Sequence, residues 1–217
     1  MMNTITQEQI EEINQKLIDM SEKVISAIEE SVDALVDQDL KKAKLIKKED
    51  KIINDIRWEI EDDCINLIAT QQPVASDLRE LIALLTINTE LERIGDYAAG
   101  IAKITLMIGD EKHVKPLIDV PRMREIAVDM VENSMKAYVN HNEKSARMIH
   151  SQDDDIDDLY NQVYRELLSF MIENPDNISQ CTHLLWASHN LERIGDRVTN
   201  ICERIIYLVS GEMAEDL

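Results

Sequence analysis

Apolar residues recur at steps of three, four and seven along most of this chain, which is the spacing of amphipathic α-helices. The first run predicts a helix from about residue 6, with Thr6 or a neighbouring residue as its cap, to about residue 36. A second run predicts a helix that ends near residue 70, because the residue before Pro73 disfavours helix. A third helix is then expected over about 73–107.

The same three-helix pattern returns in the second half of the chain. Helices are predicted at about 123–140, 143–173 and 178–209, after a linker that ends at Pro121. The offset between the halves is 103 up to the second loop and 100 after it. The matching seven-residue series are Ile46, Ile53, Ile60 and Leu67, and Ile149, Ile156, Val163 and Phe170. We predict an all-α fold of two tandem three-helix bundles related by an internal repeat, with residues 1–112 and 113–217 as its units.

One hexapeptide, Leu-Glu-Arg-Ile-Gly-Asp, occurs unchanged at residues 91–96 and 191–196. Its two carboxylates are four residues apart, so on a helix they lie one turn apart on one stripe and repel by a few tenths of a kcal/mol. Its glycine costs about 1 kcal/mol against alanine in a helix interior. A multivalent cation would offset the repulsion, and close approach of a neighbouring helix would account for the glycine.

The second helix of each half carries another polar pair at the same spacing. Asp50 and Asn54 align with Asp153 and Asp157, beside the apolar series of their helices. If adjacent helices pack through these apolar stripes, each pair meets the hexapeptide carboxylates along one edge of the contact between the two helices. We call this contact the seam. Oxygen donors of this kind suit hard or borderline cations. The candidate metal residues are Asp50, Asn54, Glu92, Asp96, Asp153, Asp157, Glu192 and Asp196.

Simpler interpretations stand beside this one. Most acidic pairs on helices form a solvated face, and the repeated Ile-Gly pair could have a packing role alone. His189 lies three residues before Glu192 but aligns with Thr89, which makes it a weak candidate ligand. A ferritin-like di-iron centre is disfavoured, because none of the five histidines has Glu three residues before it.

Composition narrows the classes of partner. The chain has 43 acidic and 23 basic residues and a formal charge of −20, so nucleic acids and anionic lipid surfaces would be repelled. No apolar run approaches the roughly 20 residues of a membrane span. Three scattered cysteines, Cys64, Cys181 and Cys202, are expected to be buried thiols in a reducing compartment. We expect a cytoplasmic protein without direct membrane insertion.

The chain resembles the PhoU family of phosphate-uptake regulators. The resemblance lies in Gln-Pro-Val-Ala-Ser-Asp-Leu-Arg at residues 72–79, in residues 90–96, in the second hexapeptide, and in residues 200–203. It implies two three-helix bundles and a cytoplasmic negative regulator that is not an enzyme. It further implies partners in a phosphate ABC transporter, through its ATPase subunit, and in a phosphate-sensing histidine kinase.

The resemblance also implies multinuclear iron or zinc, held by paired acidic motifs at the eight candidate residues. Asn54 departs from the acidic pattern, so the first site is expected to bind metal more weakly. A homodimer is plausible, because amphipathic helices often leave apolar edges. The alternatives are a metal-dependent enzyme or metal-storage bundle, and a metal-free structural adaptor.

Overall fold

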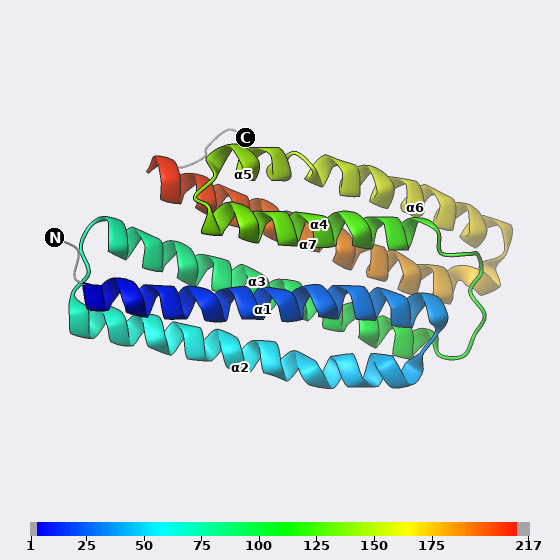
Figure 1. Cartoon of the computed structure of the whole chain (residues 1–217). Coiled ribbons are helices and arrows are strands. Elements are labelled where there is room, and N and C mark those ends of the chain that lie inside the picture. The colour runs from blue at the N-terminus through cyan, green and yellow to red at the C-terminus, as the bar shows by residue number, and fades with distance from the viewer. Residues whose placement is uncertain (1–3, 212–217) are drawn as a thin grey trace.

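The computed structural model describes residues 4–211 and contains no β-strand among them. Two layers of helices lie side by side, one from each half of the chain (Figure 1). The elements are α1 (Thr4–Asp37), α2 (Leu40–Gln71), α3 (Ser76–Ile108), α4 (Asp119–Val139), α5 (Glu143–His150), α6 (Asp153–Glu173), the short 3₁₀ helix η1 (Pro175–Asn177) and α7 (Ile178–Ser210). The predicted all-α fold of two tandem bundles is confirmed.

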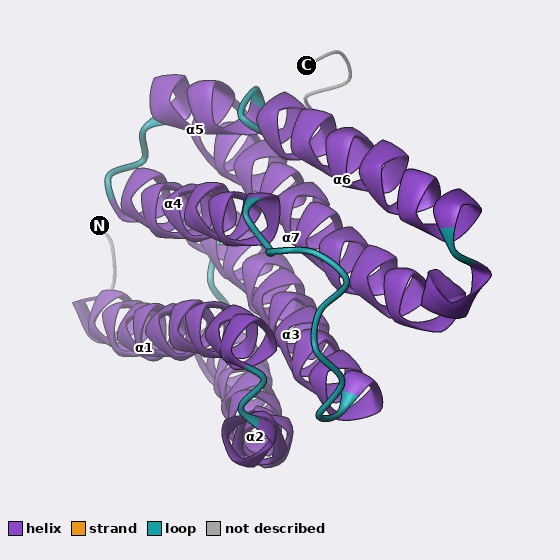
Figure 2. Cartoon of the chain, turned by 90° about the vertical axis from the view of Figure 1, so that its right-hand side faces the viewer, coloured by secondary structure: helices purple, strands orange, loops and turns teal. Residues whose placement is uncertain are grey.

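Each half folds as a triangle of helices when the molecule is seen end-on (Figure 2). The first is built by α1, α2 and α3, and the second by α4, by α5 with α6, and by α7. The halves meet where α3 packs on α7 and α1 on α4. Buried apolar residues of both halves form one continuous core, and the three cysteines are buried and free. None of the helices within 4–211 is long and apolar enough to cross a bilayer.

The first interhelical turn of each half confirms the predicted offset of 103. Gln38 and His141 occupy matching positions and both have positive φ, of 56° and 48°. The next residue caps the following helix in each half. Asp39 Oδ1 accepts from the backbone N–H of residue 42 at 2.9 Å, and Asn142 Oδ1 accepts from Ser145 N–H at 3.1 Å. Both halves therefore turn through the same backbone conformation and start the second helix by the same device.

The contact between α3 and α7 follows an approximate two-fold symmetry. Glu90 Oε2 on α3 accepts from Arg197 Nη1 at 3.4 Å and from Asn200 Nδ2 at 3.2 Å. With the halves exchanged, Asn190 Nδ2 on α7 donates to the Tyr97 carbonyl at 3.3 Å and packs against Gly100. The two halves thus associate much as the subunits of an isologous dimer do.

Three helix boundaries differ from the sequence prediction. The expected helix 143–173 is interrupted at Ser151 and Gln152, where α5 ends and α6 begins. Three aspartates fill the first turn of α6, where the helix dipole favours negative charge, and this stabilises a new start there. α3 begins at Ser76 rather than Pro73, because Gln72 and Ala75 adopt positive φ. α4 begins at Asp119 and holds Pro121 in its first turn, a position that proline tolerates.

The first predicted helix is also longer than expected. α1 begins at Thr4, so Thr6 lies inside the helix and does not cap it. Residues 1–3, which precede this helix, lie outside the described residues.

Candidate metal centre

The hexapeptide glycines bring a second helix close to each acidic stripe. A Cβ added at Gly95 would lie 3.0 Å from Ile53 Cδ1 and 3.8 Å from Asp50 Oδ1. A Cβ at Gly195 would collide with Asp153 Oδ1. The predicted packing role of the glycine is therefore confirmed in both halves. Because the missing side chain lets Asp50 and Asp153 reach α3 and α7, the packing also sets the carboxylates of adjacent helices against each other.

In the second half, the predicted residues share one electrostatic environment. Burial, together with the charges of Asp157, Asp196 and Glu192, raises the pKa of Asp153 to about 7. Burial and then the Asp196 carboxylate raise the pKa of Asp157, and the same two causes raise the pKa of Glu192. His189 and Arg193 oppose the shift at Glu192. The two pairs on α6 and α7 thus interact electrostatically across the seam.

The first half brings its residues together in the same way, with less charge. Burial and the Asp96 carboxylate raise the pKa of Asp50. Burial and the charges of Asp96 and Asp50 raise the pKa of Glu92, while Arg57 and Arg93 oppose the rise. Asn54 Nδ2 donates to Asp50 Oδ2 at 3.2 Å, so the amide contributes a donor where the second half has a fourth carboxylate.

Three carboxylate oxygens in these seams are buried without a hydrogen-bond partner: Asp50 Oδ1, Asp153 Oδ1 and Glu192 Oε2. His189 Nδ1 lies 3.1 Å from the last of these oxygens. A buried acceptor with no donor is costly and calls for a positively charged neighbour. The donor set and its unsatisfied oxygens fit a cation. Within residues 4–211, however, no three His, Cys, Asp or Glu side chains stand together as a preformed cation site, so coordination requires side-chain rotation.

Several groups that act on the seams were not identified as site residues from the sequence. Arg57 enters the first seam from α2 and weakens the shift at Glu92. Arg193 pairs with Asp196 and also bonds the Tyr97 side chain of the other half. Arg93 instead pairs with Glu90, at 3.5 Å. The pairs of Arg193 with Asp196 and of Arg93 with Glu90 lie one helical turn apart, so helix spacing alone allows them. The Tyr97 partner lies in the other half, and apolar periodicity carries no signal for it.

The structure defines an all-α protein built from two related three-helix bundles, each with an acidic seam. The family model for the PhoU domain matches this chain twice, over residues 17–105 and 120–205. The chain belongs to the PhoU family. That family consists of regulatory accessory proteins and not of enzymes.

Individual relatives agree with this assignment over nearly the whole chain. The phosphate-specific transport system accessory protein PhoU homolog of Clostridium acetobutylicum is 39% identical over 216 residues, 99% of each chain. That of Rhizobium meliloti is 34% identical over 94% of this chain and 86% of its own. The crystal structure of the phosphate transport system regulatory protein PhoU from Streptococcus pneumoniae superimposes with a TM-score of 0.91, at 30% identity, over 98% of this chain and 100% of that one. The crystal structure of PhoU from Pseudomonas aeruginosa superimposes with a TM-score of 0.90, at 31% identity, over 95% of this chain and 99% of that one.

Proposed function

We propose that this chain is a negative regulator of phosphate uptake and of phosphate-responsive signalling. It acts as a metal-binding adaptor in the cytoplasm, on the ATPase subunit of a phosphate ABC transporter and on a phosphate-sensing histidine kinase. Family membership and the relatives' names as transport-system accessory proteins support the role in phosphate transport. The charge of −20 favours partners with basic surfaces.

The observation that carries the metal proposal is the unsatisfied Asp153 Oδ1, buried among the charges of Asp157, Glu192 and Asp196. These four residues would hold metal in the second half, as multinuclear iron or zinc in line with the family resemblance. A cation held by these residues would supply the positive charge that keeps the acids ionised at neutral pH. The chain's own residues fix the distance between α6 and α7 through Gly195 and orient the carboxylates from two rigid helices.

The first half offers a weaker version of the same arrangement. Asp50, Glu92 and Asp96 supply three carboxylates, and Asn54 supplies an amide oxygen once its side chain turns away from Asp50. Loss of one charge lowers the affinity for a multivalent cation. We therefore expect the second half to fill first. Metal in both seams would remove the repulsion between paired helices and hold the shape of the surface that partners meet.

Deletion and complementation in the source organism test this function. Deleting the gene should derepress phosphate uptake and kinase output in phosphate-rich medium, and the parent gene should restore repression. A variant with Glu92, Asp96, Glu192 and Asp196 changed to Gln or Asn should accumulate normally and fail to restore it. The matched control changes four exposed acids outside the seams, Glu12, Glu29, Asp62 and Asp155, and should complement. Unchanged uptake after deletion would contradict the regulatory role, and full complementation by the seam variant would contradict the role of the metal.

A further inference from the structure

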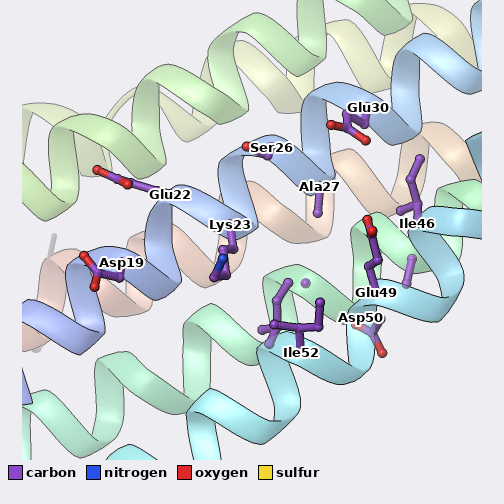
Figure 3. A pocket seen from close by; sticks show the side chains of 13 residues that line it. Asp19, Glu22, Lys23, Ser26, Ala27, Glu30, Ile46, Glu49, Asp50 and Ile52 are labelled. Atoms are coloured by element: carbon purple, nitrogen blue, oxygen red, sulfur yellow. The ribbon is translucent and has the colours of Figure 1, made fainter.

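A groove between α1 and α2 of the first half holds a cavity of about 560 Å³ (Figure 3). Its floor is formed by Gly95 and Ala99 of α3, two residues with little or no side chain. Its apolar wall includes Ile46, Ile52 and Ile53 of α2. Ile52 remains 48% exposed in this groove, so apolar surface faces solvent there.

The charged residues of the groove are mostly acidic. Asp19, Glu22 and Glu30 line it from α1, and Glu49 and Asp50 line it from α2, against one lysine, Lys23. Glu49 and Lys23 extend into the space between the two helices (Figure 3). Among the described residues, Glu22, Glu30 and Glu49 take part in no hydrogen bond or ion pair. Three carboxylates beside an apolar wall are thus available to a positively charged ligand.

A groove of the second half shares three repeat-matched positions with this one and lacks its charge. It lies between α4 and α5, has a cavity of about 530 Å³, and none of the residues that line it is acidic. At the repeat offset of 103, Glu30 corresponds to Asn133 and Glu49 to Gln152, whereas Ile46 corresponds to Ile149. The second half keeps acids at other matching positions, because Glu22 and Asp50 correspond to Glu125 and Asp153. It has Asp155 where the first half has the exposed Ile52. The combination of exposed isoleucine and unpaired carboxylates is therefore a property of the first half.

We propose that the groove between α1 and α2 docks a basic amphipathic helix of a protein partner. The apolar side chains of that helix would cover the exposed Ile52, and its Lys or Arg residues would pair with Glu30 and Glu49. The inference rests on the proposed function, since it assigns one face of the adaptor to partner binding. It does not depend on metal, because Glu30 and Glu49 are outside the candidate metal set.

Charge complementarity selects this occupant. A second copy of the chain, itself at −20, would bring repulsion into the groove. A small polyamine would satisfy the carboxylates but leave Ile52 exposed. A helix with apolar residues at i, i+3, i+4 and i+7 and flanking basic residues fits both surfaces, and the volume accepts several of its side chains.

The test uses the full chain and a labelled synthetic peptide with leucines at i, i+3, i+4 and i+7 and lysines on the flanking positions. Fluorescence anisotropy at near-physiological ionic strength should show saturable binding. The double variant E30N/E49Q, which takes the second half's residues, should weaken binding about three- to tenfold and reduce its salt dependence. The matched control E29N/D62N removes the same charge at exposed positions outside the groove and should bind as the parent does.

A second variant separates helix docking from simple cation binding. Ile52→Asn removes exposed apolar surface without a charge change, so it should weaken peptide binding and leave spermine binding unaltered. Equal loss in E30N/E49Q and E29N/D62N would overturn the proposal in favour of non-specific attraction. Full peptide affinity in Ile52→Asn would overturn it in favour of a cation site. Because all eight candidate metal residues are intact in these variants, a failure here is distinguishable from a failure of the metal proposal.

Discussion

Asp153 supplies a direct prediction about stability, because its charge is buried among other acids. Its pKa rises from 3.8 to about 7 on folding. A raised pKa in the folded state means that the protonated acid stabilises the fold below about pH 4, and that this contribution is lost as pH rises through about 7. At about 1.4 kcal/mol per unit the shift corresponds to about 4 kcal/mol, and partial solvent exposure reduces this to about 1–2 kcal/mol. Asp153→Asn should therefore stabilise the metal-free protein at alkaline pH.

The assay is urea unfolding followed by circular dichroism, in chelator, at about pH 4 and about pH 8. The gain from Asp153→Asn should be near zero at the lower pH and about 1–2 kcal/mol at the higher one. Asp155→Asn is the matched control, because it removes the same charge from an exposed position in the same first turn of α6. A gain at alkaline pH that Asp155→Asn reproduces, or a loss of stability there, would refute the reasoning.

Three further predictions concern the seams and the contact between the halves. Gly195→Ala should lower the free energy of unfolding, because the new Cβ would meet both Asp153 and Ile156 Cδ1, the latter at 3.2 Å, and overpacking of about 2–3 kcal/mol exceeds the gain of about 1 kcal/mol in helix propensity; a raised melting temperature would contradict the close approach of α6 to α7. Asn54→Asp should lower stability in chelator and raise the metal affinity of the first half, which isothermal titration measures; unchanged affinity would show that the fourth carboxylate is not a ligand. Glu90→Gln should cost about 1–3 kcal/mol in urea unfolding, because it removes the buried partner of Arg197; a neutral effect would show that this ion pair does not hold the halves together.

Apolar spacing is enough to predict the fold of this chain, because each helix buries one stripe and both halves repeat it. The heptad of α2 from Ile46 to Leu67 is buried as expected. The repeat offset also predicts which acids face each other, since register is kept through α2 and α6. The break at Ser151 could not be predicted in this way, because the apolar pattern continues across it from Ile149 to Ile156.

The parts of the site that the sequence did not reveal depend on packing between distant segments. The ion pair of Glu90 with Arg197 joins residues on α3 and α7, and nothing local marks them as partners. The acidic groove arises because Glu30 and Glu49 come from two helices that pack side by side. Either residue alone looks like part of a solvated helix face.

The metal content of the purified protein tests the central claim most directly. Untagged protein, prepared without chelator, should contain iron or zinc by elemental mass spectrometry. The variant with Glu92, Asp96, Glu192 and Asp196 changed to Gln or Asn should be equally helical and contain none. If the parent contains no metal and takes up none when it is added back, the acidic seams are packing and docking elements, and the account of a metal-binding adaptor is wrong.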